Sequence, residues 1–210
     1  MIIDLHVHTL PLSRDSFLEF PGVIEHAKQS GLDGICVTEH EQFWNKEELA
    51  RLSEEHDFLL LPGIELWSDD NHFLVFGLEE RKERMWMAYK LREVVDEAGA
   101  VMILAHPARW QYAEVNDMDE ALERYCRQSF LKYVDIIEVL NGRLSDAVNE
   151  FQIELSRRMG FKGTGGSDAH SLSDIPSAAT RFEKNISNLE DLITELKAGR
   201  FEAVNIRKNS

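Results

Sequence analysis

Short apolar runs alternate with amphipathic stretches along the whole chain of 210 residues, and this alternation limits its possible folds more than any other feature. Most of the runs are rich in Val, Ile, Leu or Phe, as strands buried on both faces are. They lie at residues 2–7, 34–38, 58–64, 72–76, 100–105, 134–140 and 161–164. Helical patterns fill most of the gaps between them. Strand–helix alternation of this kind indicates an α/β fold with a mostly parallel sheet, either open or closed into a barrel.

The clearest helical pattern lies near the C-terminus. Ser187 precedes Glu190 by three residues, a spacing typical of a capping box, and Gly199 follows the pattern as a stop signal. One apolar stripe runs between them, made of Leu189, Leu192, Ile193 and Leu196. These signals predict an amphipathic helix that starts at Ser187 and ends before Gly199.

The composition is that of an ordinary globular protein, with 43% hydrophobic and 29% charged residues. A chain of this length buries one core, so we expect a single domain over residues 1–210. No apolar run approaches the ~20 residues needed to cross a bilayer, and the first residues lack the basic and apolar regions of a signal peptide. Cys36 and Cys126 form no CxxC pair, which argues against a disulfide framework or a zinc ribbon. We therefore expect a cytoplasmic protein.

The formal net charge of -15 restricts the partners of the chain. Acidic residues outnumber basic ones by 38 to 23, whereas a protein that binds long nucleic acids usually presents a face rich in Lys and Arg. A small anionic substrate is compatible with this charge if bound cations reverse the local potential. The sequence leaves the oligomeric state open.

Most of the histidines stand at the ends of the apolar runs. His6 and His8 close the first run, and residues two apart on a strand point the same way, so both imidazoles can reach one metal ion. Glu65 and Asp168 occupy similar places after two other runs. The remaining histidines at run boundaries are His40, His72, His106 and His170.

Imidazole nitrogens combined with carboxylate oxygens suit zinc, iron or manganese. These candidate ligands are too many for one tetrahedral ion, so we expect two or three divalent ions. Clustered ions bind phosphate oxygens, make hydroxide available near neutral pH and stabilise the leaving oxygen. The glycines at residues 163–166 lack the Lys-Ser/Thr pair of a phosphate-binding loop, and no Ser/His/Asp elbow is present.

Four short motifs resemble those of the PHP (polymerase and histidinol phosphatase) domain family. They are the HxH of DLHVHT, the TEH that ends at His40, the AHP at His106 and the GSDAH that contains Asp168 and His170. Their order matches the family from residue 2 to about residue 205, and the IEVLNGR stretch and the AGRF near the C-terminus are also similar to it.

This resemblance implies a distorted (β/α)7 barrel with a trinuclear metal site. His6, His8, Glu65 and Asp168 would surround the first ion, and Glu65 would bridge to a second ion held by His72 and His106. His40 and His170 would hold the third ion, with Asp15 as the variable ligand. Glu39 departs from the TDH that is common in the family and would support His40. Asp168 and His170 are the residues expected to act directly in catalysis.

The implied activity is hydrolysis of a phosphate ester by a metal-bound hydroxide. A small phosphomonoester is the first expectation, and a short phosphodiester is the second. Arg109 and Arg143 are candidates to contact the phosphate, since guanidinium groups match phosphate oxygens. Glu138 and Asn141 are expected to orient a ligand or to contact the substrate. The tryptophans near these motifs, which wall the pocket, pack in the core or form a partner surface, are Trp44, Trp67 and Trp110.

Three other functions fit parts of the pattern. A metal-dependent amidohydrolase also begins with HxH on its first strand, but Glu65 and the Asp168–His170 pair argue against it. A protein tyrosine phosphatase of the same broad family would share the metals and act on a partner chain. A non-catalytic metal-binding regulatory module would have lost ligands, whereas here every expected position holds a residue able to bind metal.

Overall fold

The computed structural model describes residues 1–69, 71–81, 85–109 and 117–206. Within these ranges the strands form two five-stranded sheets, with the orders β10-β9-β1-β2-β3 and β4-β5-β6-β7-β8. The strands are β1 (Ile2–Val7), β2 (Gly34–Val37), β3 (Leu59–Pro62), β4 (Ile64–Ser68), β5 (Asn71–Phe76), β6 (Val101–Ala105), β7 (Ile136–Asn141), β8 (Lys162–Gly166), β9 (Ala178–Phe182) and β10 (Phe201–Asn205). The α-helices are α1 (Gly22–Gln29), α2 (Lys46–His56), α3 (Ala88–Glu97), α4 (Met118–Cys126), α5 (Asp146–Met159) and α6 (Leu189–Ala198).

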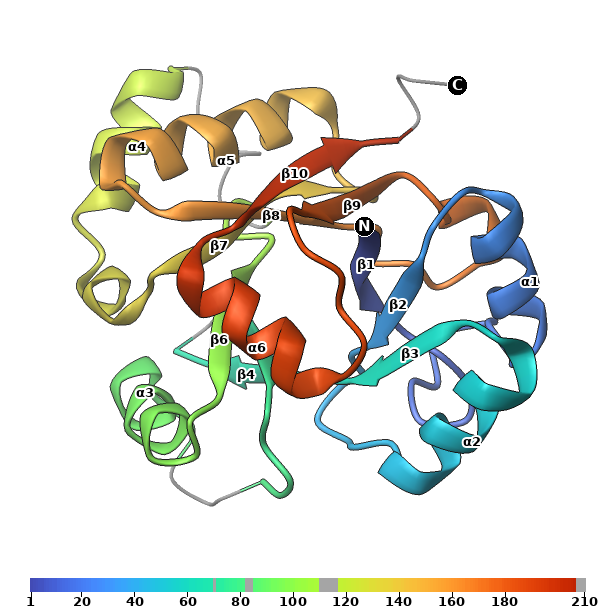
Figure 1. Ribbon diagram of the computed structural model, residues 1–210. Helices are drawn as coiled ribbons and strands as arrows, with labels where there is room; N and C mark the ends of the chain where they lie inside the picture. The colour runs from blue at the N-terminus through green and yellow to red at the C-terminus, as the bar shows by residue number, and fades with distance from the viewer. Residues whose placement is uncertain (70, 82–84, 110–116, 207–210) are drawn as a thin grey trace.

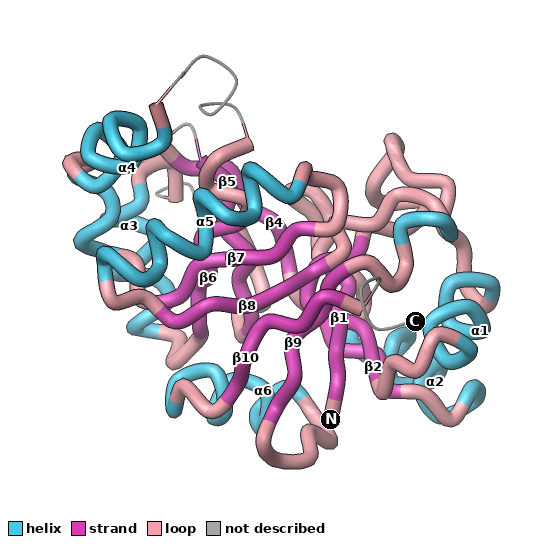
Figure 2. The backbone as a smooth tube through the Cα atoms, turned by 90° about the horizontal axis from the view of Figure 1, so that it is seen from above, coloured by secondary structure: helices cyan, strands magenta, loops and turns pink. Residues whose placement is uncertain are grey.

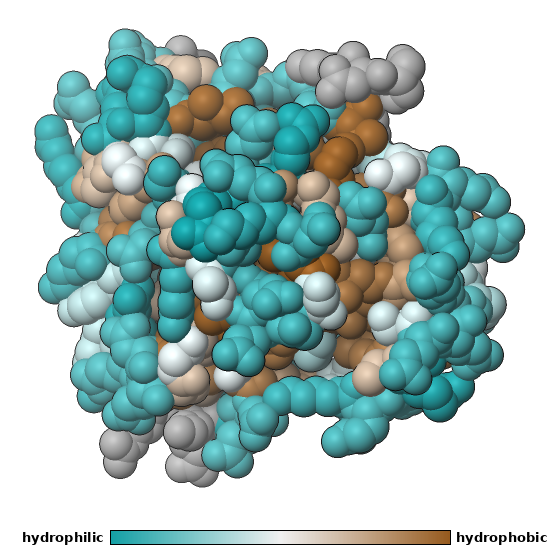
Figure 3. All heavy atoms as spheres, viewed as in Figure 1, coloured by the Kyte–Doolittle hydropathy of each residue, from teal (hydrophilic) through white to brown (hydrophobic). Residues whose placement is uncertain are grey.

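The strands lie in the middle of the molecule and the helices around them (Figure 2). In Figure 1, α1 and α2 lie beside β2 and β3, whereas α4 and α5 lie at the opposite side of the molecule. Hydrophilic side chains cover most of this face, with hydrophobic residues beside them over β1 and β2 (Figure 3). No helix among the described residues reaches the length and hydropathy that a bilayer crossing requires.

The α/β fold expected from the sequence is confirmed, but the predicted closed (β/α)7 barrel is not found in the described part of the chain. The two sheets are mixed, because β5 pairs antiparallel with both β4 and β6, and β9 pairs antiparallel with both β1 and β10. Parallel pairing is limited to β1–β2, β2–β3, β6–β7 and β7–β8. The sequence analysis missed β9 and β10, and it joined β3 and the start of β4 into one run.

Gly63 marks the point where the chain passes from the first sheet to the second. Its backbone N–H donates to the carbonyl of Val37 at 2.9 Å, and the next residue, Ile64, already pairs with Val75 in the other sheet. A Cβ atom at Gly63 would lie 2.6 Å from the Phe76 ring. Glycine therefore permits a tight crossover here, which places the end of β2 beside the start of β4.

The hydrophobic core has three parts that follow from this architecture. An inner cluster joins residues of both sheets, such as Leu5 and Leu74, to Leu192 and Leu196 of α6. The second cluster packs α1 and α2 against β1–β3, and the third packs α3, α4 and α5 against β4–β7. Figure 1 shows α6 between β6 and β3, where it covers the inner cluster at one end.

The start of α6 differs from the prediction by one residue. Asn188, not Ser187, is the N-cap, and its side chain accepts a hydrogen bond from the backbone N–H of Asp191 at 2.9 Å. The Asp191 carboxylate in turn accepts from the backbone N–H of Ser187 at 2.9 Å. A reciprocal pair of side chain–backbone bonds therefore starts the helix, as in a capping box, but with Asn and Asp in place of Ser and Glu.

The two sheets are linked at β8 and β9 by a side chain. The hydroxyl of Thr180 accepts a hydrogen bond from the Gly165 N–H at 3.0 Å and donates to the Gly165 carbonyl at 2.8 Å. A Cβ atom at Gly165 would lie 2.4 Å from the carbonyl oxygen of Ala179, so the strands approach closely at this point. The Thr180 hydroxyl thus takes the place of a backbone partner at the seam, which is the line where β8 of one sheet meets β9 of the other.

We predict that Thr180→Val lowers the free energy of unfolding by about 1–3 kcal/mol, because it leaves buried backbone groups of Gly165 without this partner. Thr180→Ser is the matched control, because it keeps the hydroxyl. Urea unfolding followed by circular dichroism measures both variants. A valine variant as stable as the wild type would show that the Thr180 hydroxyl contributes nothing to the seam.

Candidate metal centre

Histidines and carboxylates from both sheets converge at the carboxyl ends of the parallel strands. His6 lies near the end of β1, and His106 and Asp168 come one and two residues after β6 and β8, whereas Glu65 lies at the start of the antiparallel strand β4. The other predicted site residues brought to this region are His8, Asp15, His40, His72, Arg109, Arg143 and His170. Chemistry gathers at the same end of the strands in α/β barrels, and the residues predicted from the sequence come together here although the described strands form no closed sheet.

Glu65 is the centre of one half of the cluster. Its Oε1 lies 2.9 Å from His72 Nδ1 and 3.0 Å from His106 Nε2, and its Oε2 lies 2.8 Å from His40 Nδ1. The side chain is 1% exposed. Burial alone would raise the pKa of Glu65, but His6 and the neighbouring imidazoles hold this pKa well below its ordinary value.

Asp168 is the centre of the other half. Its Oδ1 lies 3.7 Å from His6 Nε2 and 3.5 Å from His8 Nε2, and its Oδ2 accepts from Arg109 Nη1 at 3.1 Å. Burial opposes the charged form, but His6 and His8 lower the pKa of Asp168 well below its usual range. The carboxylate is therefore ionised, with the Arg109 guanidinium and the His6 imidazole beside it.

An outer pair of histidines meets Asp15 near the protein surface. Asp15 Oδ2 lies 3.3 Å from His40 Nε2 and 3.2 Å from His170 Nε2. The Asp15 side chain is 60% exposed, in contrast to the buried Glu65 and Asp168. Asp15 thus reaches the outer edge of the cluster from the loop after β1.

Three sets of side chains each bring their ligand atoms within 4.8 Å of one another. These sets are His8–His40–His170, His6–Glu65–His106 and His6–His8–Asp168. The partition differs from the one implied by the family resemblance, because His6 and His8 each belong to two sets. His72 and Asp15 lie outside all three sets, although each contacts members of them.

Five buried ligand atoms in this region make no hydrogen bond of regular geometry among the described residues, although two of them, His40 Nδ1 and Glu65 Oε2, lie 2.8 Å apart as an ion pair. They are His6 Nε2, His8 Nε2, His40 Nδ1, Glu65 Oε2 and Asp168 Oδ1. A buried polar atom without a partner carries the full cost of its desolvation, and coordination of a cation offsets this cost. These side chains therefore fit divalent ions, and the mixture of imidazole and carboxylate is one that zinc, iron and manganese accept.

The protonation states of His6 and His8 differ in the metal-free protein. Burial alone would lower the pKa of His6, but the carboxylates of Glu138 and Asp168 outweigh burial and raise it well above its ordinary value. Burial lowers the pKa of His8 to about 3. One imidazolium thus shares the centre with several carboxylates, while the second imidazole keeps a free lone pair for a cation.

Glu138 on β7 holds three parts of the site together. It accepts hydrogen bonds from His6 Nδ1, from the backbone N–H of His106 and from Asn141 Nδ2, each at 2.9 Å. Asn141 Nδ2 also lies 3.3 Å from Asp168 Oδ2. Because an ionised carboxylate only accepts, the bond to Nδ1 leaves His6 Nε2 facing the cluster. Of the two roles that the sequence left open, the structure places Glu138 and Asn141 in the ligand-orienting one.

Glu39 supports a different residue from the one expected. Its carboxylate accepts from the Thr9 backbone N–H at 2.9 Å and from Trp44 Nε1 at 2.7 Å, and it also contacts the Thr9 hydroxyl. Thr9 directly follows His8, so Glu39 fixes the end of the HxH segment. Trp44 is half-buried and packs edge-on against Phe20, which makes it a packing residue. Trp110 lies outside the described residues.

Asp4 is a site-supporting residue that the sequence analysis missed. Its buried Oδ1 accepts from the backbone N–H of His6 at 3.1 Å and of Ser167 at 2.9 Å, which ties β1 to the turn before Asp168. Burial raises the pKa of Asp4 to about 7 against the effect of these hydrogen bonds. A carboxylate two residues before His6, inside an otherwise apolar run, was the signal available in the sequence.

The backbone turns sharply at two of the site residues. His106 has a φ of 27° and Asp168 a φ of 55°, both in the left-handed region that residues other than glycine rarely adopt. Such conformations cost about 1–3 kcal/mol each and persist only where the surroundings impose them. Here the turns follow β6 and β8 directly, and each places its side chain in the cluster.

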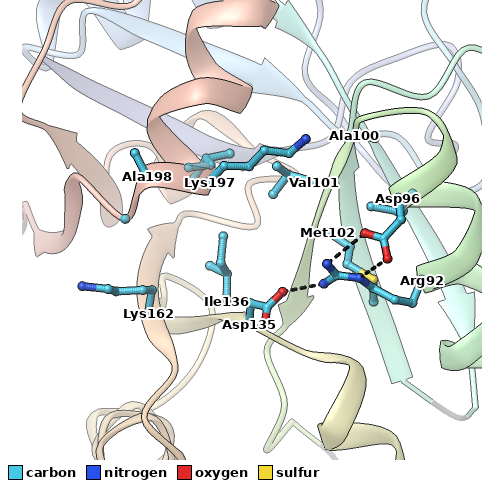
Figure 4. Close-up of a pocket in the computed structure, with 13 residues that line it drawn as sticks. Arg92, Asp96, Ala100, Val101, Met102, Asp135, Ile136, Lys162, Lys197 and Ala198 are labelled. Carbon is cyan, nitrogen blue, oxygen red and sulfur yellow. Dashed lines mark hydrogen bonds and ion pairs between the residues drawn. The ribbon is translucent and has the colours of Figure 1, made fainter.

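A separate cavity of about 570 Å³ lies at the other ends of these strands, between α3 and α6. Arg92 on its wall is paired with Asp96 and Asp135, as Figure 4 shows. Lys197 donates to the carbonyl of Gly99 at 2.6 Å. These charges satisfy one another or the backbone, and no residue of the histidine cluster lines this cavity.

Fold and cluster together define an α/β protein with candidate metal ligands gathered at one end of its sheets. The family model of the PHP domain matches residues 4–143, and that of the PHP-associated region matches residues 147–201. The chain belongs to the PHP domain family, which confirms the resemblance found in its motifs. An uncharacterized protein of Methanocaldococcus jannaschii, MJ0417, is 30% identical over 200 residues, which are 91% of this chain and 75% of that protein.

Solved structures share the fold at lower identity. A proposed metal-dependent phosphoesterase of Bifidobacterium adolescentis is 17% identical, with a TM-score of 0.64 over 93% of this chain and 95% of its own. An amidohydrolase of Chromobacterium violaceum, solved with bound sulfate and no metal, is 16% identical, with a TM-score of 0.60 over 97% and 98% of the two chains. At these identities the likeness concerns the fold alone.

We predict that Glu138→Gln weakens the affinity for Zn²⁺ or Mn²⁺ about ten- to a hundredfold, because it removes the charge that orients His6. Competition with a chelating dye measures this affinity. Glu150→Gln, an exposed change on α5, is the matched control and leaves the affinity unchanged. Equal metal affinity in the Glu138 variant and the wild type would refute the orienting role.

Proposed function

We propose that this protein is a metal-dependent phosphoesterase that hydrolyses a small phosphate monoester, with a short phosphodiester as a second class of substrate. The observation that carries this proposal is the convergence of buried imidazole and carboxylate atoms from both sheets, several of which make no hydrogen bond of regular geometry. Two arginines border the same cluster. The family of the chain is consistent with this activity.

The cluster is proposed to hold two or three divalent ions. His6, His8 and Asp168 would hold one, and Glu65 with His106 would hold another, with His72 beside it. Of the outer residues, His40 and His170 would hold a third ion together with Asp15. Bound ions of this kind supply Lewis acidity toward phosphate oxygens and lower the pKa of water, so no protein nucleophile is required.

Arg143 is proposed to bind the substrate phosphate. His170 Nδ1 lies 2.8 Å from both Arg143 Nη1 and the carbonyl oxygen of Asp168, and it can serve only one of them. If His170 Nε2 presents its lone pair to a cation, the single proton of the neutral ring is on Nδ1 and is donated to the carbonyl. The guanidinium of Arg143 is then free to donate to phosphate oxygens.

Arg109 is proposed to have a different role, because its guanidinium is already paired with Asp168. Its Nη1 donates to Asp168 Oδ2 at 3.1 Å and lies 3.4 Å from His106 Nε2. The guanidinium therefore neutralises the outer oxygen of Asp168 at the edge of the cluster. A phosphate dianion placed there meets two cationic side chains as well as any bound ions.

The two arginines favour a phosphate ester over the amide substrate of an amidohydrolase, because they match a doubly charged tetrahedral group. The sulfate bound by the amidohydrolase of Chromobacterium violaceum is also a tetrahedral dianion. The net charge of -15 favours a small substrate over a long nucleic acid. A phosphorylated protein partner is the alternative class of substrate.

We predict that the purified protein releases inorganic phosphate from a panel of aryl, sugar and nucleoside monophosphates when Mn²⁺, Zn²⁺ or Fe²⁺ is supplied. Chelator abolishes this release, and His8→Ala loses it, because His8 lies in two of the candidate ligand sets. His56→Ala, on α2 away from the cluster, is the matched control. Absence of phosphate release with every metal, from protein that binds metal, would exclude the phosphomonoesterase; hydrolysis of amides instead would favour the amidohydrolase.

We predict that Arg143→Ala raises KM about ten- to a hundredfold, because a charge-assisted hydrogen bond to the phosphate is lost. Steady-state kinetics on the best substrate of the panel measures this change. Arg127→Ala, a change at a side chain that is 79% exposed, is the control. An unaltered KM in the Arg143 variant would remove this residue from the substrate site.

A further inference from the structure

Trp67 is a large apolar side chain at the mouth of the cluster. Its side chain lies on β4, two residues beyond Glu65, and the residue is 56% exposed. Because side chains alternate along a strand, Glu65 and Trp67 share one face, about 7 Å apart along it. Leu66 between them is buried in the cluster that packs against α3, on the opposite face. The indole therefore lies directly outward from the carboxylate at the centre of the site.

His72 connects Glu65 to Trp67. Trp67 and His72 are direct partners in the antiparallel pairing of β4 and β5, and their rings stack with centroids 5.0 Å apart and an angle of 10°. His72 Nδ1 lies 2.9 Å from Glu65 Oε1. Side-chain exposure is 1% for Glu65 and 15% for His72, and Trp67 is 56% exposed. These three side chains form a path from the buried centre to solvent.

The backbone of Trp67 is held in place from the first sheet. Its N–H donates to Glu41 Oε1 at 2.7 Å, and the Glu41 carboxylate also pairs with Arg81 at 2.5 Å. Glu41 follows His40, so the loop that carries one candidate ligand also fixes the strand that carries the indole. A ring that is held in this way loses little freedom when a second ring stacks on it.

We propose that Trp67 is a stacking surface for a planar, unsaturated ring in the alcohol part of the substrate. This inference rests on the proposed function, because a phosphate at the cluster directs the rest of the ester outward past His72. An aromatic pair in offset stacking gains affinity beyond the area that it buries. The substrate class is therefore a phosphate ester that carries an aryl ring or a nucleobase, in contrast to a purely aliphatic sugar phosphate.

The first test compares phenylphosphonate with cyclohexylphosphonate, which share size and charge and are not hydrolysed. Isothermal titration calorimetry with the metal-loaded protein measures both dissociation constants. We expect the wild type to bind the phenyl compound up to about tenfold more tightly. Trp67→Ala removes this preference, so that the variant binds the two phosphonates equally well, and Trp67→Phe retains most of the preference.

Trp86→Ala is the matched control. Trp86 is 63% exposed, and its ring lies under the guanidinium of Arg81 at 4.6 Å instead of against a histidine of the cluster. This variant keeps the preference for the phenyl ring. A preference that survives Trp67→Ala, or none in the wild type, would overturn the stacking role and leave Trp67 as packing for His72.

The second test separates the two sources of a planar ring. Adenosine 5′-monophosphate and ribose 5-phosphate present the same type of phosphate ester with and without a base. If Trp67→Ala lowers kcat/KM for adenosine 5′-monophosphate but not for ribose 5-phosphate, the ring that stacks on Trp67 is a nucleobase. If the variant affects only the binding of phenylphosphonate, the ring is a compact aryl group. If both 5′-phosphates are hydrolysed and Trp67→Ala has no effect in either test, the stacking role of Trp67 is rejected and the proposed function stands. If no ester is hydrolysed, the proposed function is rejected as well.

Discussion

The structure depends on how it accommodates ionisable groups that are buried together at one end of the strands. Glu65 and Asp168 are almost completely buried, and imidazoles from several strands point at them. Carboxylates in such a place are costly unless positive charge accompanies them. The surrounding features follow from this demand: Glu138 fixes His6, Asp4 ties β1 to the turn before Asp168, and the backbone adopts left-handed turns at the ligand-bearing ends of β6 and β8.

The division into two mixed sheets serves the same arrangement. Glu65 comes from the second sheet, whereas His6 lies on the first, and the crossover at Gly63 brings these strands together. Near the cluster, the β-bridges that join the sheets in the described part of the chain are the isolated ones Val7↔Ala169 and His40↔Glu65. The side chains of the site thus span a seam that backbone pairing leaves incomplete. A cation bound by residues of both sheets would join them at this seam.

The sequence predicted the site better than the sheet. Histidines at the ends of apolar runs are recognisable because strand ends meet at one edge, and the motifs around His6, His106 and Asp168 add their order. Strand direction has no such local signal: β9 and β10 contain the polar Arg181 and Glu202, and their pairing depends on the distant strand β1. The supporting roles of Asp4 and Glu138 were also hard to predict. They depend on which backbone N–H each carboxylate meets across the fold.

The central claim is that divalent cations compensate the charge of the buried cluster. Its most direct test is the free energy of unfolding of chelator-treated protein, measured by urea denaturation over a range of free Zn²⁺ or Mn²⁺ concentrations. The account predicts that stability rises with the logarithm of metal concentration, by about 2.7 kcal/mol for one site at a hundredfold excess over Kd. The same titration of Glu65→Gln should show a much smaller rise. A wild-type protein whose stability is indifferent to metal would contradict the claim.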